Sequence, residues 1–483
     1  MHTDKNKAKF RLFSCIAVIG IGAGWLNQAH SGGFALIEHG ASGLGNAYAG
    51  AAAVSADGST VWFNAAGMSE IKSREFSLAL HGLSTSTKWT DEGSALGSAF
   101  GGAQVSGPQT SNPGTTTALP NVYYVAPIND KWHYGLSIGV PFGSSTEYDD
   151  DWKGRYTTVS SSLNVIDINP ALSYRVSDKV RLGVGLSFQR LSVELGSAVD
   201  SGTACLGLIS TAGASFSQTD CFNNGLVPGN RANDGYAEVT GDSTGIGFNL
   251  GALFLPRDDV KIGLAYRHSV DHDLDGDADF DVNPQLQTLL ASNTNPSPES
   301  QAVTQGIFRD VSASAEVELP ATFSVSGAWQ IYDKLQLLSD MTWTGWSSFQ
   351  ELRINFDNPV QSDTVSIQDW QDVFRYSVGL NYQIDSKLTL RGGLAFDEEA
   401  IPNAQRRTAR IPGNDRTWYA IGASYSVSDK FSFDLGFTHL TLDETPIDND
   451  GSDPSRPGTG QIVRGLYDSS INILSAQVNW TFK

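Results

Sequence analysis

Three short motifs contain side chains whose types and spacing could support chemistry. Gly135, Ser137 and Gly139 have the G-x-S-x-G spacing of a serine nucleophile, which would act in acyl transfer. That motif works at a sharp turn between a strand and a helix, with histidine and acidic partners. Here it falls in the middle of an alternating, strand-like segment, so we do not expect an enzyme.

The other two motifs could bind a nucleotide or a metal ion. Residues 40–45 read GASGLG, but a nucleotide-binding loop needs a surrounding strand-helix-strand unit, so we interpret them as a site of close packing. Asp271, Asp273 and Asp275 begin like a calcium-binding loop, whose twelfth position should be glutamate and is Val282 here. The sequence therefore predicts an acidic rim, with no metal site and no cofactor.

The N-terminus has the features of a secretory signal. Basic residues at positions 5, 7, 9 and 11 precede an apolar run at residues 12–26, and a small-x-small cleavage site follows at residues 29–31. A membrane anchor is the alternative, but about 15 apolar residues are short for a spanning helix of about 20. We expect residues 1–31 to be removed.

The composition limits the partners of the mature chain. Acidic residues number 52 and basic residues 32, which gives a formal net charge of −20. Nucleic acid is excluded as a partner, because binding it requires a basic surface. The acidic residues gather in segments that we expect to be solvated loops, such as residues 147–151 and 271–281. Cys205 and Cys221 share one predicted loop and could form a disulfide in an oxidising compartment.

Alternating segments recur along the chain beyond residue 73. Short turns in which an acidic residue lies just before a lysine occur at residues 129–131, 177–179, 258–261, 332–334, 385–387 and 428–430. A segment with a period of two residues follows each turn, as expected for a strand with two different faces. Runs of about 9 to 11 residues suit a tilted strand that crosses a bilayer. The mean hydropathy of −0.20 is compatible with this, because only one face of such strands is apolar.

The connections between these segments set the number of strands. Long polar connections lie at about residues 89–116, 144–154, 195–243, 273–310, 347–368, 397–414 and 442–467. Short turns at one end and long loops at the other are typical of outer-membrane barrels. Six short turns and seven long loops require fourteen strands. We therefore predict an all-β fold, a 14-stranded antiparallel transmembrane β-barrel over residues 74–483; a soluble sandwich or propeller is the alternative.

Residues 32–73 precede the barrel and do not alternate. They are rich in glycine and alanine, which favours close packing against other backbone. Eight strands already enclose a lumen that side chains can fill, so a barrel of fourteen needs an additional plug. We predict that this segment is a hatch inside the lumen; a periplasmic extension is the alternative.

The third predicted strand, residues 131–143, carries a proline at position 141. Proline cannot donate to a β-ladder and is tolerated at strand ends, edges and bulges. Either the wall is interrupted at Pro141 or the strand ends there.

Several long stretches carry a family resemblance: GGFALIEHGASGLGNAYAG, LPNVYYVAPINDKW, GVPFGSSTEYDDDW, MTWTGWSSFQEL and RGGLAFDEEAIPNAQRRTARIPGNDRTWYAIGASY. They resemble the FadL/TodX family of outer-membrane transporters for long-chain fatty acids and other hydrophobic compounds. The resemblance implies a fourteen-stranded barrel, a hatch, a substrate-capturing groove among the outer loops and a kinked third strand that opens the wall sideways. The opening would involve Gly139, Pro141, Phe142 and Gly143.

The resemblance also points to specific hatch and substrate-binding positions. The family's Asn-Pro-Ala hatch motif is matched by Asn64, Ala65 and Ala66, so the proline is missing. In fatty-acid members, basic residues near the outer end of the fifth strand and before the tenth strand help to hold the carboxylate. The matching positions here are Ser197 or a neighbour, and Ser366 or Ile367.

A carboxylate in a low-dielectric site still needs a partner. Strand phase places Arg267, Arg375 and Arg391 on the lumen face, because Tyr266, Tyr376 and Leu390 would face lipid. We predict these arginines as substrate-binding substitutes for the missing basic pair. They could equally serve only to neutralise lumen carboxylates.

The resemblance implies passive transport of long-chain fatty acids across the outer membrane of a Gram-negative cell, by a monomer that contacts outer-membrane lipids. Uptake of uncharged alkanes or aromatic hydrocarbons by the same route is the nearest alternative, favoured by the missing basic pair. An outer-membrane lipid hydrolase and a purely structural barrel are the remaining alternatives.

Overall fold

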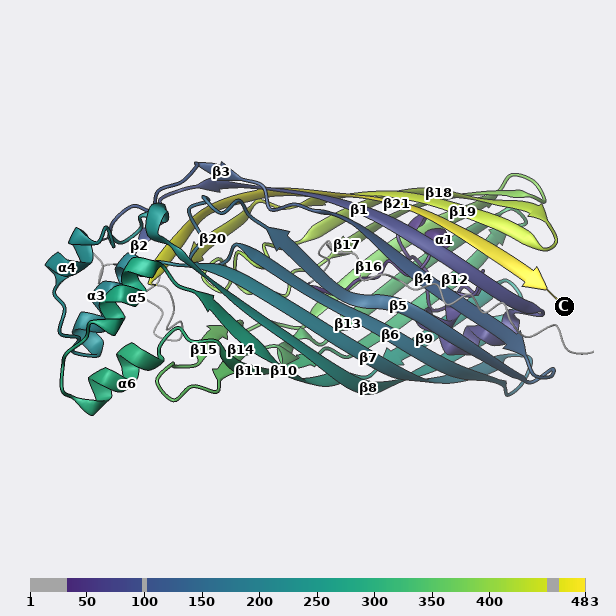
Figure 1. Ribbon diagram of the computed structural model, residues 1–483. Helices are drawn as coiled ribbons and strands as arrows, with labels where there is room; N and C mark the ends of the chain where they lie inside the picture. The colour runs from purple at the N-terminus through teal and green to yellow at the C-terminus, as the bar shows by residue number, and fades with distance from the viewer. Residues whose placement is uncertain (1–32, 98–101, 450–459, 483) are drawn as a thin grey trace, which may run out of the picture.

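A computed structural model describes residues 33–97, 102–449 and 460–482 of the chain (Figure 1). The predicted signal segment, residues 1–31, lies outside the described residues. Among the helices described, none is both long enough and apolar enough to cross a membrane.

One closed antiparallel sheet of fourteen strands forms the wall, as predicted. In chain order the strands are β1 (Arg74–Asp91), β4 (Thr116–Pro127), β5 (Trp132–Glu147), β6 (Ser160–Arg175), β7 (Val180–Val199), β8 (Gly235–Arg257), β9 (Val260–Arg267) continued by β10 (Val270–Asp281), β11 (Val311–Leu319) continued by β12 (Thr322–Tyr332), β13 (Leu335–Thr344), β16 (Val373–Gln383), β17 (Leu388–Asp397), β18 (Arg416–Ser428), β19 (Phe431–Leu442) and β21 (Gln461–Phe482). The last strand pairs with the first, from Arg74 opposite Phe482 to Asp91 opposite Gly465. This pairing closes the barrel.

The predicted short turns all join neighbouring strands at one end of the barrel, and the long loops lie at the other end (Figure 1). Several strands are longer than the 9 to 11 residues expected, and β8 has 23. The wall therefore continues beyond the length that a bilayer requires. Residues 271–281 were expected in a loop, and this expectation is wrong: they form β10. Their carboxylates are exposed and alternate with inward-facing residues such as His272 and Leu274.

Alternation along each strand separates a lipid face from a lumen face. On β7, Leu182, Val184, Leu186 and Phe188 are exposed large apolar residues, while Ser187 between them is buried. The same outward pattern recurs on the other strands that cross the membrane. The G-x-S-x-G segment lies inside β5, so it forms no turn between a strand and a helix.

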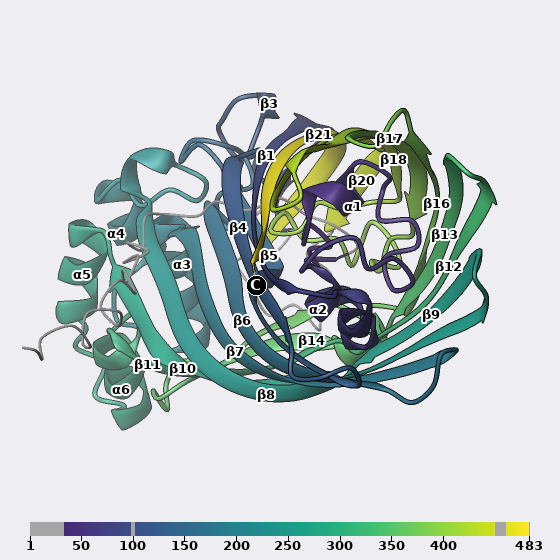
Figure 2. The ribbon, with the colours of Figure 1, turned by 90° about the vertical axis from the view of Figure 1, so that its right-hand side faces the viewer.

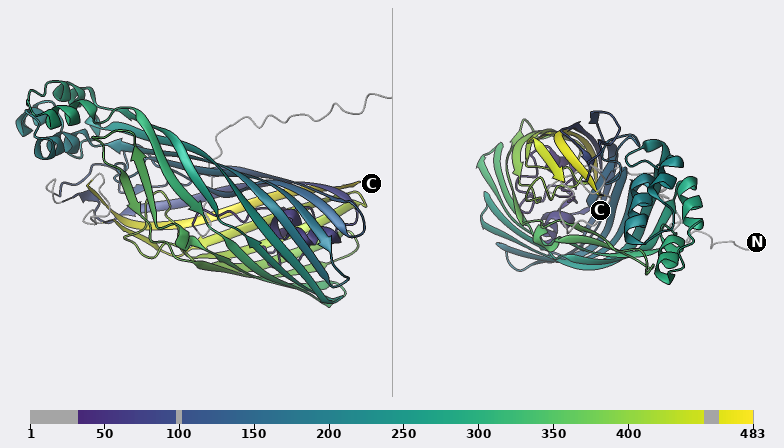
Figure 3. Two further views of the ribbon diagram at one scale, coloured as in Figure 1. Left: turned by 90° about the horizontal axis from the view of Figure 1, so that it is seen from below. Right: turned by 90° about the vertical axis from the view of Figure 1, so that its left-hand side faces the viewer.

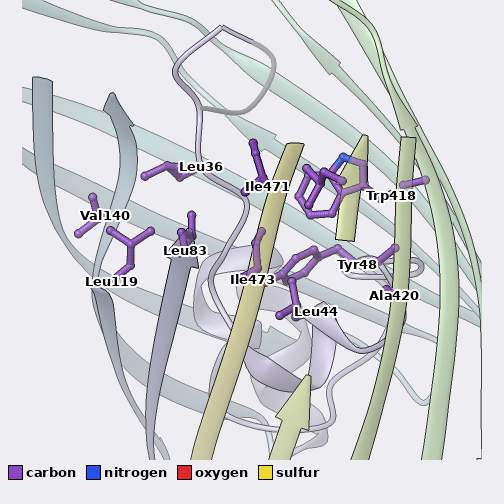
Figure 4. Packing of buried hydrophobic residues seen from close by; sticks show 13 residues of the cluster. Leu36, Leu44, Tyr48, Leu83, Leu119, Val140, Trp418, Ala420, Ile471 and Ile473 are labelled. Carbon is purple, nitrogen blue, oxygen red and sulfur yellow. The ribbon is translucent and has the colours of Figure 1, made fainter. Parts of the chain in front are cut away.

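The hatch, residues 33–73, lies inside the barrel near the short-turn end (Figure 2). It contains the short helices α1 (Ala41–Leu44) and α2 (Thr60–Phe63) and the 3₁₀ helix η1 (Ala65–Glu70). Leu36, Leu44 and Tyr48 pack against wall residues that include Trp418 and Ile473 (Figure 4). Backbone approaches backbone directly, because a Cβ added to Gly45 would lie 2.8 Å from the Cα of Gly422. The glycine-rich composition thus permits the tight fit of the hatch.

The long loops contain more regular structure than their polar composition indicated. They include the helices α3 (Ser201–Thr211), α4 (Gln218–Asn223), α5 (Pro284–Ala291) and α6 (Pro298–Gly306), and the small strands β2 (Ala95–Leu96), β3 (Thr110–Ser111), β14 (Glu351–Phe356), β15 (Thr364–Ile367) and β20 (Thr445–Asn449). The four helices cluster beside the outer end of the barrel (Figure 3). Their shared core contains the disulfide between Cys205 and Cys221. These loops were long enough to build a small core of their own.

Candidate functional site

A cavity of about 600 Å³, here the outer cavity, lies between the hatch and the outer loops. It is lined mainly by apolar side chains, which include Leu163, Val193, Leu274, Phe349, Ile354 and Phe356. This volume falls within the roughly 300–1,000 Å³ of small-molecule sites. An elongated apolar ligand could bury its surface here, and burial of apolar surface is the main source of affinity for such a molecule.

Phe34 of the hatch separates the outer cavity from the interior of the barrel. Its ring centroid lies 4.7 Å from that of Trp346, 5.7 Å from that of Trp370 and 5.8 Å from that of Phe349, with edge-to-face or tilted geometry. Phe142 of β5 completes this cluster at 6.1 Å from Phe34. We call these five residues the aromatic gate. All of them are buried.

The hydrogen bonding of β5 changes at the predicted lateral opening. Against β6, the register shifts between Gly139 and Phe142, which leaves Pro141 within a bulge. Against β4, pairing ends at Val122 opposite Ile138, although both strands continue outward. The edges of β4 and β5 are therefore not joined by ladder bonds beyond this point.

The outer half of β5 pairs with the hatch instead of β4. The Leu36 N–H donates to the carbonyl of Pro141, and the Gly143 N–H donates to the carbonyl of Phe34, both at 2.8 Å. The segment that carries Phe34 is thus a short extra strand against the bulged region. A backbone movement of residues 34–36 away from β5 must break or shift these two bonds.

A second cavity of about 140 Å³, the inner cavity, lies beside the hatch. Its lining includes Pro141 and Phe142 of β5 together with Arg267 and Arg375. The aromatic gate therefore lies between the two cavities, because Phe34 and Phe349 line the outer one. The carboxylates of Asp340 and Asp397 also line the inner cavity, so apolar side chains meet both arginines and aspartates there.

The three predicted arginines are in different environments. Arg267 lies 3.5 Å from the ring centroid of Trp62 and donates to the Trp62 carbonyl. Arg375 donates to the carbonyl of Ala47 at 2.9 Å, and within the described part of the chain its Nε and Nη1 have no hydrogen-bond partner. Arg391 forms an ion pair with Asp434 at 2.7 Å and is not among the residues that line these two cavities.

Comparison with known proteins decides the family. The family described as outer membrane protein transport protein (OMPP1/FadL/TodX) matches residues 23–482. The chain belongs to this family. It is an outer-membrane β-barrel, and the predicted family and location are confirmed.

Individual members of the OMPP1/FadL/TodX family give the degree of similarity. The long-chain fatty acid transport protein of Escherichia coli O6:H1 is 29% identical over 416 residues, which cover 86% of this chain and 87% of that protein. A FadL homologue from Pseudomonas aeruginosa has a TM-score of 0.80 at 25% identity, covering 93% of this chain and all of that one. The toluene transporter TodX of Pseudomonas putida has the same fold, with a TM-score of 0.62 at 17% identity over 93% and 99% of the two chains.

The family hatch motif ties two parts of the hatch to the wall. The Asn64 side chain accepts from the Ala66 N–H at 3.1 Å and donates to the carbonyls of Ala52, at 2.7 Å, and Ala252 of β8, at 3.0 Å. Ala65, where the family has proline, occupies the first position of η1. Proline is compatible with this position of a helix.

Ser197 and Ser366, which the resemblance predicted at the family's basic positions, both line the outer cavity. The cavity therefore coincides with the expected substrate region but lacks the basic pair. Among the described residues, its lining contains one arginine, Arg410, which the sequence did not indicate. Arg410 lies in a loop between β17 and β18, where no strand phase indicates the direction of a side chain. In the described part of the chain, no group of three or more His, Cys, Asp or Glu residues could hold a metal ion.

Proposed function

We propose that this protein carries long-chain fatty acids passively across the outer membrane and releases them sideways between β4 and β5. The observation that supports this best is the coupling of the apolar outer cavity to the broken strand through Phe34. The name of the Escherichia coli relative supports the substrate class. Transport in this proposal involves no covalent step and no cofactor. The transporting unit is a monomeric barrel in contact with outer-membrane lipids.

The proposed sequence of events begins at the outer loops. A fatty acid enters the outer cavity with its alkyl chain against the apolar wall. Its terminal part competes with Phe34 for the aromatic gate. When Phe34 leaves, the two hydrogen bonds between the hatch and β5 are lost as well. The unpaired edges of β4 and β5 then give the ligand a route toward the membrane.

The predicted site residues have separate roles in this proposal. Arg375 and Arg267 line the inner cavity, and Arg375 has unpaired N–H groups that could meet a carboxylate after the gate opens. Arg391 neutralises Asp434 and keeps β17 and β19 in place around the hatch. The division into a leader at residues 1–31, a hatch at 32–73 and a barrel at 74–483 belongs to the same proposal.

Uptake of uncharged hydrocarbons is the second candidate function. Ser197 and Ser366 favour it, because the carboxylate partners of fatty-acid members are replaced by neutral side chains. A hydrocarbon would need only the apolar wall and the gate.

Uptake by whole cells tests the proposed function. A strain that lacks its own long-chain fatty acid transporter is supplied with this gene and given labelled oleate or labelled hexadecane. We expect oleate uptake, with a smaller rate in Arg375→Ala at equal amounts of folded barrel in the outer membrane. Hexadecane uptake without oleate uptake would replace the fatty-acid proposal by the hydrocarbon one. Uptake of neither compound would contradict both.

A further inference from the structure

The outer cavity contains a cation whose environment suits a carboxylate. Of the described residues that line it, the charged ones are Arg410 and Asp200. Asp200 caps α3, where it accepts from the N–H groups of Gly202 at 3.0 Å and Thr203 at 3.1 Å and from that of Gly229 at 2.9 Å. Its negative charge is thus already satisfied by local donors.

Arg410 differs from the other arginines that lie deep in the outer region. Arg155 has a carboxylate of Asp234 at 2.7 Å, Arg416 has one of Asp397 at 3.7 Å, and Arg407 pairs with Glu399. Arg410 has no carboxylate within 4.0 Å among residues 33–97, 102–449 and 460–482. Its electrostatic neighbours are the hydroxyls of Tyr236 and Tyr148, and burial lowers the pKa of Arg410 to about 10. The guanidinium therefore stays charged at neutral pH, and no carboxylate of the described residues pairs with it.

The guanidinium of Arg410 is held in place. It donates to the carbonyls of Ser160 at 2.7 Å and Thr157 at 3.1 Å. These bonds use two of the five N–H groups that an arginine presents. The backbone on either side is anchored as well, since Tyr148 donates to the Ala409 carbonyl at 2.8 Å. A fixed guanidinium with spare donors is suited to bidentate binding of a carboxylate.

We propose that Arg410 binds the carboxylate of a fatty acid in the outer cavity and takes the place of the basic residues missing at Ser197 and Ser366. This inference rests on the proposed function and makes it more specific. Arg410 thereby sets the preference for an anionic over an uncharged ligand. A half-buried charge that has only neutral hydrogen-bond partners gains from a counter-ion, so the carboxylate stabilises the loop that carries Arg410 as it binds.

The test compares two ligands with the same chain and different heads. Binding of oleate and of oleyl alcohol to the purified full-length protein is measured by calorimetry in the same detergent. A hydrogen bond to a charged group contributes enough that Arg410→Gln should weaken oleate binding about 10- to 100-fold. Oleyl alcohol binding should be unchanged. Arg410→Lys keeps the charge but loses the planar fork of the guanidinium, so its affinity for oleate should lie between those of the wild type and Arg410→Gln.

Arg406→Gln is the matched control, because Arg406 lies in the same loop, pairs with Asp369 and is absent from the cavity lining. It should bind both ligands normally. Equal losses of oleate and oleyl alcohol binding in Arg410→Gln and Arg410→Lys would show a structural role and overturn the inference. Unchanged oleate binding in Arg410→Gln would also overturn the inference. In that case the proposed function would still stand, provided that the wild-type protein itself binds both ligands. If the wild type bound neither ligand, the proposed function would fail together with the inference.

Discussion

Truncation of Phe34 should uncouple the hatch from β5. Phe34 is 1% exposed and contacts the other four aromatic gate residues. Removing a buried phenylalanine ring costs about 3–5 kcal/mol. If about 3 kcal/mol of this stabilises residues 33–36 in their position against β5, the population in which they are detached from β5 rises about 100-fold, since about 1.4 kcal/mol is a factor of ten.

Hydrogen exchange measures this opening, because the amides of Leu36 and Gly143 form the two bonds between hatch and strand. In Phe34→Ala, peptides that cover these amides should exchange up to about 100-fold faster. Peptides from the centre of β21 should not change. Phe34→Leu keeps an apolar side chain at the gate and should give a smaller increase. Equal exchange in Phe34→Ala and the wild type would refute the assignment of Phe34 as the gate.

Three further substitutions test the hatch and the outer helices. Asn64→Ala removes the hydrogen bonds to Ala52 and Ala252. It should lower the free energy of unfolding by about 1–3 kcal/mol, because donors and acceptors are left unpaired, and this appears as a lower melting temperature. An unchanged melting temperature would contradict the role of Asn64. Ala65→Pro should keep uptake and raise stability by about 0.4–1 kcal/mol, because Asn64 before it is already extended; loss of folding would show that η1 cannot accept proline. Cys205→Ser should make the outer helices sensitive to protease, since a cross-link of this length contributes about 3 kcal/mol, while the barrel still assembles; equal protease resistance would show that helix packing alone holds them.

The number of strands could be predicted because each hairpin carries its own signals. A turn such as residues 385–387 and the alternation that follows it are local, and each added hairpin changes the count by two. The position of the hatch could also be predicted, because a glycine- and alanine-rich segment and an unfilled lumen explain each other. The missing N–H of proline indicated a disturbance at Pro141, but it did not decide between an interrupted wall and the end of the strand; the structure shows that β5 continues past a bulge.

The cavities could not be predicted, because they are assembled from residues far apart in the chain. The outer cavity extends in sequence from Phe34 to Val463. The alternation along β17 correctly predicted that Arg391 faces the lumen. It cannot show whether a lumen-facing side chain lines a cavity or pairs with a residue of another strand, as Arg391 does with Asp434. For Arg410 there was no phase at all, because it lies in an irregular loop.

A removable cross-link between β4 and β5 tests most directly whether the ligand leaves sideways between these strands. Asn121 and Gly139 are the first residues beyond the paired part of these strands, and a Cβ added to Gly139 would touch the Asn121 side chain. A double variant with Asn121→Cys and Gly139→Cys should therefore form a disulfide across the opening. The control pair, Val122→Cys with Ile138→Cys, joins residues that are already opposite each other.

Uptake of labelled oleate is measured with and without a reducing agent, and the wild type is treated in the same way because Cys205 and Cys221 are also reducible. We expect the oxidised Asn121/Gly139 double variant to take up no oleate and reduction to restore its uptake. The oxidised control pair should transport at the wild-type rate. Normal uptake by the fully cross-linked Asn121/Gly139 variant would contradict lateral exit through this part of the wall.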